Sequence, residues 1–255
     1  MIAASSGLTT ALVLAGSRGG TDPVAVHEGV VHKALVQIGG ETMLSRVITA
    51  LRDAGLQRVL VSTDIAEVAA AALALGAEVV GTASGPSESV SRAFERTGAP
   101  LLVTTADHAL LAPDWVSHFV RETPLAADVS IMLARQQDVE AILPESRRTW
   151  MRFADGGWSG CNLFLLATPA ASRVLDSWRS VEAERKNPLR LALRLGWGTL
   201  FDFLLGRLNM AEAVVRLGHR MGVSAAMVPA TNGLAAVDVD KVDDLILVRR
   251  VIEKR

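Results

Sequence analysis

Short apolar runs recur along the first half of the chain. Four of them, each four or five residues long and nearly continuous in apolar character, cover residues 11–15, 58–62, 77–81 and 101–105. Runs of this length without polar alternation are typical of strands that are covered on both faces. The pattern therefore predicts the central strands of a mostly parallel sheet.

Between and after these runs, apolar residues recur at helical spacing. This spacing predicts helices over residues 43–54, 65–75, 87–96 and 240–253, and Asp64 or Ser87 could cap a helix start. Further strands are predicted at residues 128–134, 160–166 and 225–229. The alternation of strands and helices predicts an α/β fold, a three-layer α/β/α Rossmann-like sandwich with a mostly parallel mixed sheet.

One interval, residues 169–222, departs from the alternation and reads as mainly helix. We interpret the chain as a single domain, residues 1–255, that carries this interval as a helical insertion. Within it, Leu, Trp and Phe recur at helical spacing, and Arg190, Arg194 and Arg207 add positive charge. Two explanations stay open: the insertion packs on the domain or on a second copy in a homodimer, or it makes a weak contact with an anionic membrane surface.

Composition narrows the class of protein. A chain of 255 residues that is 50% hydrophobic can bury one sizeable core, and a net charge of −1 gives no reason to expect nucleic acid as a partner. The single cysteine, Cys161, excludes an intramolecular disulfide and fits a reducing compartment. No apolar run approaches the roughly 18 residues of a membrane-spanning helix. We therefore expect a cytoplasmic protein.

A turn of small residues follows the first predicted strand, in the stretch "LVLAGSRGG" at residues 12–20. Ligands of parallel sheets bind at the carboxyl ends of strands, where backbone N–H groups of such a turn can approach phosphate oxygens. Arg18 could add a bidentate clamp and Lys33 a point charge. The stretch lacks the residues of a P-loop or a dinucleotide fingerprint. The alternative is a glycine turn with two solvated cations.

Carboxylates occur at two other places where predicted strands or loops end at the same edge of the sheet. Asp107 comes directly after the predicted strand 101–105, and Asp238 and Asp240 come just before the last helix. Carboxylates at two strand ends can share one hard cation, typically Mg²⁺. A turn aspartate at Asp107 and a helix cap at Asp240 are the alternatives. The five histidines show no spacing of a zinc site.

Three stretches together resemble a known family: "LAGSRGG…HKALVQIGGETMLSRVITAL", "TTADHALL" and "AAVDVDKVDDL". They are similar to the signature of the MobA-like NTP transferases, nucleotidyltransferases of GT-A-like fold. The resemblance implies Mg²⁺-dependent joining of an NTP to a phosphorylated small molecule, a sugar or alcohol phosphate, with release of pyrophosphate. The loop before Arg18 is shorter than the family pattern, and the interval from Gly20 to Lys33 is longer.

By matching position, the resemblance also implies roles for individual residues. Arg18 and Lys33 would carry the catalytic positive charge, and Asp107 and Asp240 would hold the metal, with Asp238 as second choice. The implied nucleotide-binding residues are Leu14, Ala15, Gly16, Ser17 and Gly19.

Two further stretches resemble substrate-binding segments of relatives. In "GPSESVSRAF", Ser89 matches a base-reading position of cytidylyltransferases, and the alternative is a helix capped by Ser87. In "GGWSGCNLFLL", Gly160 and Asn162 match an acceptor-binding segment, and the alternative is a glycine turn before a strand.

Two other functions stay open at this point. The first is a nucleotide-sugar-dependent glycosyltransferase of GT-A type, suggested by the Asp-x-Asp pair at Asp238 and Asp240. The second is a non-catalytic nucleotide-binding module.

Overall fold

A computed structural model describes residues 7–17, 19–145, 148, 150–184 and 197–253. Within these ranges the strands are β1 (Thr10–Leu14), β2 (Gln37–Ile38), β3 (Glu41–Thr42), β4 (Arg58–Ser62), β5 (Glu78–Val80), β6 (Leu101–Thr105), β7 (Val129–Arg135), β8 (Met151–Phe153), β9 (Gly156–Leu166) and β10 (Ala225–Pro229). The helices are α1 (Pro23–Glu28), α2 (Met43–Asp53), α3 (Ala66–Ala74), α4 (Pro86–Thr97), α5 (Pro113–Glu122), α6 (Gln136–Ile142), α7 (Ser172–Glu184), α9 (Trp197–Leu204), α10 (Met210–Arg220) and α11 (Val242–Glu253), with 3-10 turns η2 (Lys33–Leu35), η3 (Pro169–Ala171) and η4 (Gly233–Ala236).

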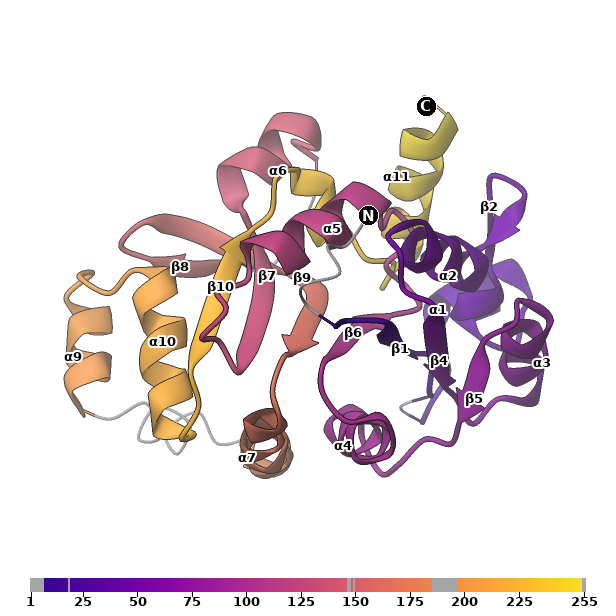
Figure 1. Cartoon of the computed structure of the whole chain (residues 1–255). Helices are drawn as coiled ribbons and strands as arrows, with labels where there is room; N and C mark the ends of the chain where they lie inside the picture. The colour runs from indigo at the N-terminus through magenta and orange to yellow at the C-terminus, as the bar shows by residue number, and fades with distance from the viewer. Residues whose placement is uncertain (1–6, 18, 146–147, 149, 185–196, 254–255) are drawn as a thin grey trace.

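One large sheet forms the centre of the molecule (Figure 1), in the order β10-β7-β9-β6-β1-β4-β5, with β8 paired to β9. Strand β9 runs antiparallel to β6, β7 and β8, whereas β1 is parallel to β4 and β6. A parallel core with an antiparallel strand is the mostly parallel mixed sheet that the sequence predicts, and the α/β fold class is confirmed.

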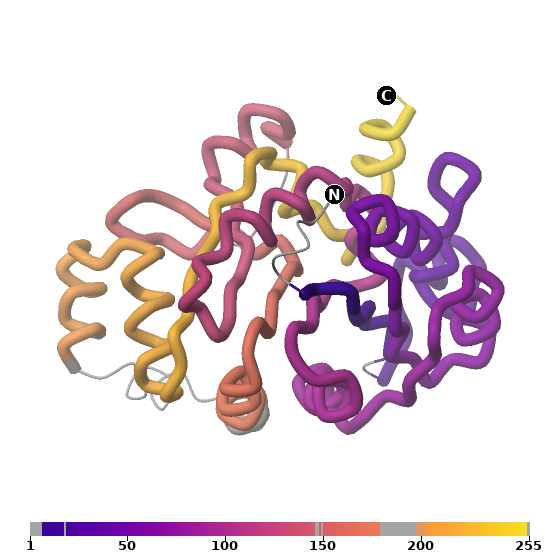
Figure 2. Tube along the Cα trace, viewed as in Figure 1, coloured from indigo at the N-terminus to yellow at the C-terminus, as the bar shows by residue number. Residues whose placement is uncertain are grey.

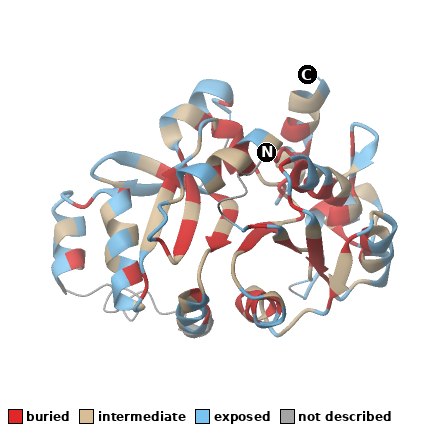
Figure 3. Cartoon of the chain, in the orientation of Figure 1, coloured by how far each residue is buried: buried red, intermediate tan, exposed pale blue. Residues whose placement is uncertain are grey.

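Both faces of the sheet are buried, which explains the continuous apolar runs. In β1, Ala11 and Val13 join the larger core with residues of α2, α5 and α11, whereas Leu12 joins a second core with residues of α4 and α7. Figure 3 shows buried residues concentrated in the strands and in the inner sides of these helices. The helices therefore form the two outer layers of the sandwich.

Some local expectations are wrong. The N-caps of α3 and α4 are Ile65 and Gly85, neither of which makes a side-chain cap hydrogen bond, so Asp64 and Ser87 do not cap these helices. Asp64 instead accepts a hydrogen bond from another loop, and Ser87 is buried. The short elements α1, α6 and β8 and the longer helix α5 were also not predicted.

The described part of residues 169–222 is mostly helical, in η3, α7, α9 and α10, with a non-helical connection over residues 205–209. Arg190 and Arg194 lie outside the described residues. Helices α9 and α10 lie next to each other at the β10 edge of the sheet (Figure 2). Gly218 lets α10 approach β10, because a Cβ at that position would lie 2.4 Å from the Cβ of Ala225. Among the described helices, none has the length and apolar character needed to cross a bilayer.

Candidate active site

The carboxyl edge of the sheet holds a lysine between two carboxylates. The Nζ of Lys33 lies 2.7 Å from Oδ2 of Asp107 and 2.9 Å from Oδ1 of Asp240. It also donates to the carbonyl oxygen of Val239 at 3.0 Å. Residues separated by more than two hundred positions are thereby joined at one point, and the structure brings together three of the residues that the sequence singled out.

The backbone fixes this arrangement from three directions. Asp107 follows the end of β6, and the hydroxyl of Thr105 donates to its carboxylate. The carbonyl oxygen of Asp107 accepts the N–H of Val239 at 3.1 Å, which docks the segment before α11 against the end of β6. Asp244 caps that segment, since its carboxylate accepts the N–H groups of Asp240 and Lys241. Because Asp244 caps these N–H groups, the side chain of Asp240 does not cap them and instead pairs with Lys33.

Electrostatics hold Lys33 and Asp107 in their charged forms. Burial opposes a charge on Lys33, but the attraction of Asp107 and Asp240 outweighs it and raises the pKa of the amine. Burial also opposes the charge on Asp107, but Lys33 and the hydroxyl of Thr105 outweigh it and hold the pKa of that carboxyl below its usual range. Lys33 is thus a permanent cation at neutral pH. The side chain of Asp240 is 63% exposed, so one side of the cluster is open to solvent.

The turn after β1 lies beside this cluster. The N–H of Ala15 bonds the carbonyl oxygen of Ser62, and the N–H of Ser17 bonds Oδ1 of Asp64 at 3.1 Å. Gly19 has a left-handed backbone with φ of 74°, which glycine adopts at little cost. Arg18 lies outside the described residues.

Gly16 packs closely against Thr82, which follows β5. A Cβ at Gly16 would lie 2.7 Å from Cγ2 of Thr82. We expect Gly16→Ala to displace the turn and to raise the KM for the nucleotide about tenfold. Because Thr82→Ser removes the obstructing methyl group, the double variant should recover most of the affinity. Equal KM values for wild type and Gly16→Ala would contradict this contact.

His32 joins the turn to the lysine, and sequence reasoning did not identify it. The residue is 8% exposed, and its Nδ1 accepts the N–H of Ala34 at 3.1 Å. Burial lowers the pKa of His32, although a hydrogen bond with the backbone of Gly16 opposes this shift. A neutral His32 therefore ties Gly16 to the start of η2, one residue before Lys33. Its only sequence signal is its position next to that lysine.

Asp238 lies in a separate polar group next to Asp240. Arg148 forms an ion pair with its carboxylate, and Nδ2 of Asn162 donates to Oδ2 at 3.0 Å. The β7–β9 register shifts at this point of β9, and Asn162 has a left-handed backbone with φ of 48°. Bulges of this kind redirect a side chain near functional sites. Asp238 thus has partners of its own, and Arg148 is a second residue that sequence reasoning missed.

Ser89 is engaged in supporting a loop. The residue is buried. Its hydroxyl accepts a hydrogen bond from the N–H of Ala83 at 2.9 Å and donates one to the carbonyl oxygen of Gly85 at 3.0 Å. In the described conformation it shapes the loop between β5 and α4.

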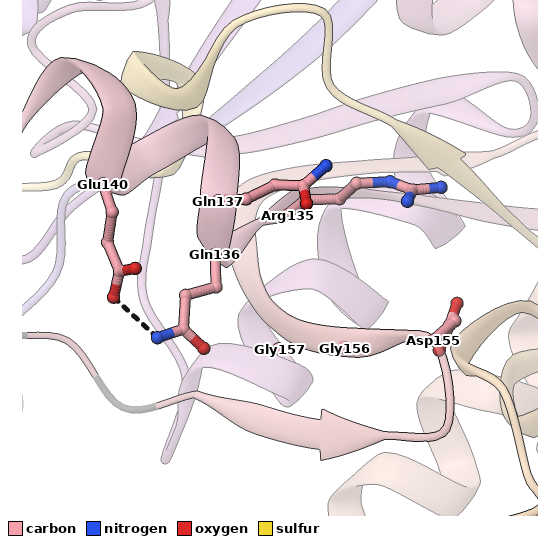
Figure 4. A pocket seen from close by; sticks show the side chains of 7 residues that line it. All are labelled: Arg135, Gln136, Gln137, Glu140, Asp155, Gly156 and Gly157. Carbon is pink, nitrogen blue, oxygen red and sulfur yellow. Dashed lines mark hydrogen bonds between the residues drawn. The ribbon is translucent and has the colours of Figure 1, made fainter.

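A cavity of about 200 Å³ opens where β7 ends and β9 begins (Figure 4), lined by Arg135, Gln136, Gln137, Glu140, Asp155, Gly156 and Gly157. Gln136 donates to Glu140 at 2.6 Å, and the guanidinium of Arg135 lies 4.9 Å from the ring centroid of Trp158. Strand β9 leads from this cavity through Gly160 to Asn162. Gly160 and Asn162, the predicted acceptor-binding residues, therefore lie between the cavity and Asp238, to which Asn162 donates a hydrogen bond.

Comparisons with known proteins identify the family of the chain. The family model of the MobA-like NTP transferase domain matches residues 11–187. A stretch of 63 residues is 43% identical to the 3-deoxy-manno-octulosonate cytidylyltransferase of Chelativorans sp. (strain BNC1), and the alignment covers 25% of each chain.

Solved structures extend the similarity to the whole fold. A hypothetical transferase from Thermus thermophilus matches with a TM-score of 0.81 and 32% identity, over 93% of this chain and 99% of its own. CMP:2-keto-3-deoxy-manno-octonic acid synthetase in complex with CTP matches with a TM-score of 0.60 and 18% identity, over 96% of this chain and 99% of its own, which is a likeness of fold.

The class that the fold and the family match define is a nucleotidyltransferase. The chain belongs to the MobA-like NTP transferase domain family, because the match covers well over half of its length.

Proposed function

We propose that the protein transfers a nucleoside monophosphate from an NTP to a phosphorylated small molecule, a sugar or alcohol phosphate, and releases pyrophosphate. The observation that carries the proposal is the cation of Lys33, held between Asp107 and Asp240 next to the turn at Gly16. A fixed positive charge beside a turn of small residues suits a substrate that carries several phosphates.

The reaction needs no covalent enzyme intermediate. A phosphate oxygen of the acceptor forms a bond to the α-phosphorus of the NTP. The bond from that phosphorus to the oxygen bridging the β-phosphate breaks, and its electron pair leaves with pyrophosphate. Lys33 and the backbone of the Gly16–Ser17 turn would stabilise the negative charge that develops on the phosphates.

The carboxylates fit a magnesium ion. Asp107 and Asp240 each direct one oxygen at Nζ of Lys33, so a magnesium ion would bind beside the amine through their remaining oxygen ligands, and oxygen is the ligand that Mg²⁺ prefers. Among the described residues, no group of three His, Cys, Asp or Glu side chains could enclose a metal. Mg²⁺ usually takes one or two carboxylates and completes its shell with water and substrate phosphates. Bound there, it would supply further charge neutralisation, and Asp238, already paired with Arg148, is the weaker candidate ligand.

The relatives suggest which substrates to try first. One is named as a cytidylyltransferase and another was solved with CTP, so CTP is the first nucleotide to test. The acceptor would lie along β9, near Gly160 and Asn162, with the polar cavity at Arg135 available for its far end.

A pyrophosphate-release screen tests the proposal. Each NTP is incubated with Mg²⁺ and with sugar phosphates, alcohol phosphates or 3-deoxy-manno-octulosonate, and Lys33→Ala serves as the blank. Pyrophosphate release that depends on a sugar or alcohol phosphate, and that Lys33→Ala lacks, supports the proposal. Release that depends on 3-deoxy-manno-octulosonate instead would keep the nucleotidyl transfer but contradict the phosphorylated acceptor. Sugar transfer from a nucleotide sugar would support a glycosyltransferase instead, and binding without turnover would support a non-catalytic module.

A further inference from the structure

Lys33 lies near the middle of a segment that joins α1 to β2. The segment starts at Glu28, the last residue of α1, and reaches β2 at Gln37. Helix α1 lies within the interval from Gly20 to Lys33, which is longer than in the family pattern. The position of the Lys33 amine therefore depends on how α1 and β2 are held.

One guanidinium on α11 binds both ends of this segment. Nη1 and Nη2 of Arg249 donate to Oε1 and Oε2 of Glu28 at 2.9 Å and 2.5 Å. Nη2 also donates to the carbonyl oxygen of Gln37 at 3.0 Å. These acceptors lie five residues before and four residues after Lys33. Because a bidentate pair with a carboxylate fixes direction as well as distance, Arg249 holds the two ends together in a defined geometry.

Helix α11 is a firm support for this contact. Its inner side is buried in the larger core through Leu245 and Val248. It packs beside α1 and β2 (Figure 1), and it directly follows the segment of Asp240, which pairs with Lys33. The segment 28–37 is therefore attached to one element at two places, at its ends through Arg249 and at its middle through Asp240.

The pair of Glu28 and Arg249 differs from a surface ion pair. Their side chains are 18% and 34% exposed. The hydrogen bonds between them lower the pKa of the Glu28 carboxyl and raise the pKa of the Arg249 guanidinium, so both are charged at neutral pH. The next residue, Arg250, pairs with Glu145, but those side chains are 53% and 56% exposed. A pair as exposed as that of Arg250 ordinarily contributes little.

We propose that Arg249 is a positioning residue for the transfer reaction, which holds the segment 28–37 so that Lys33 stays directed between Asp107 and Asp240. The inference rests on the proposed function of Lys33. None of the described contacts of Arg249 reaches Lys33 itself, so Arg249 acts through the backbone of the segment. Without the guanidinium, the two ends are no longer held together. The amine then stabilises the developing phosphate charge less well, because that stabilisation depends on a fixed geometry.

Steady-state pyrophosphate release of Arg249→Met tests the positioning role. Met keeps an apolar stem but removes the guanidinium, so we expect kcat to fall about tenfold while the KM for the nucleotide changes much less. Arg249→Lys keeps the charge but not the planar fork and should fall between wild type and Arg249→Met. Arg250→Met is the matched control on the same helix and should have wild-type kinetics.

A double-mutant cycle with Lys33→Ala separates positioning from a loss of folded protein. If Arg249 acts through Lys33, Arg249→Met lowers kcat about tenfold in the wild-type background and by less than about twofold in the Lys33→Ala background. A loss of folded protein would lower kcat by the same factor in both backgrounds. An equal factor in both, or a wild-type kcat for Arg249→Met alone, would overturn the inference.

Hydrogen exchange tests the same hold without any reaction. The N–H groups of Ala34, Leu35 and Val36 are bonded within the segment. We expect peptides that cover residues 28–37 to exchange faster in Arg249→Met than in wild type or Arg250→Met, whereas peptides of β6 exchange alike in all three.

The exchange and kinetic results together distinguish two failures. Unchanged exchange of residues 28–37 in Arg249→Met, with an active wild type, would overturn the inference and leave the proposed function intact. Faster exchange with a wild type that releases no pyrophosphate from any substrate pair would refute the proposed function, and with it the catalytic role of this contact.

Discussion

Lys33→Ala should lower kcat by about two to three orders of magnitude, while the KM for the nucleotide changes much less. The negative charge that Lys33 faces grows as the phosphorus bond to the leaving pyrophosphate breaks. Removal of the cation therefore raises the free energy of the transition state more than that of the enzyme–substrate complex. Steady-state pyrophosphate release measures both constants. Lys241 is exposed and makes the matched control, since Lys241→Ala should leave kcat unchanged.

The same variant should lose stability in a defined pH window. The folded-state pKa of Asp107 is lowered and that of Lys33 is raised, from ordinary values of 3.8 and 10.5. The pair therefore stabilises the fold fully above the unfolded pKa of Asp107 and below that of Lys33. As the pH falls through the lowered pKa of Asp107, or rises through the raised pKa of Lys33, this contribution disappears.

Urea unfolding can follow this window. We expect a free energy of unfolding about 3 kcal/mol lower for Lys33→Ala than for wild type near pH 7. The difference should shrink in strong acid. A constant difference at every pH would show that Lys33 contributes by packing and not by its charge.

Asp107→Asn and Asp240→Asn should each lower turnover by about two to three orders of magnitude and shift the activating Mg²⁺ concentration upward. Both substitutions keep the size of the side chain but remove the negative charge that attracts the cation. Asp243 is an exposed carboxylate on α11, so Asp243→Asn controls for a change in surface charge. The measurement is pyrophosphate release as a function of Mg²⁺ concentration.

Asp238→Asn distinguishes the two aspartates before α11. Because Asp238 pairs with Arg148 and Asn162, we expect its replacement to change acceptor KM and stability more than Mg²⁺ dependence. A Mg²⁺ shift for Asp238→Asn that equals the shift for Asp240→Asn would make Asp238 a ligand. Wild-type kinetics of Asp107→Asn would remove the metal assignment altogether.

The central strands were predictable because burial on both faces leaves a continuous apolar run, as in β1 and β6. The proximity of Lys33, Asp107 and Asp240 followed in part from the rule that parallel strands end at one edge. The partners of the individual side chains could not be predicted from the sequence. The ion pairs of Lys33 join residues that are 74 and 207 positions apart, and they depend on how the segment before α11 packs against the end of β6.

Other features depended on tertiary context. The left-handed conformation of Asn162 comes from the register shift between β7 and β9, which no local pattern encodes. Asp64 has the residue type of a helix cap, yet its carboxylate meets the N–H of Ser17 because β1 and β4 are neighbours. Helix α5 did carry a signal, since Trp115, Val116 and Phe119 are spaced to bury one side.

The most direct test of the proposed reaction is product analysis with an NTP labelled at the α-phosphorus. The account predicts that the label appears in a product that contains the nucleoside monophosphate joined to the acceptor, with one pyrophosphate released for each product formed. Recovery of the label in a nucleoside diphosphate, with orthophosphate as the other product, would contradict transfer at the α-phosphorus.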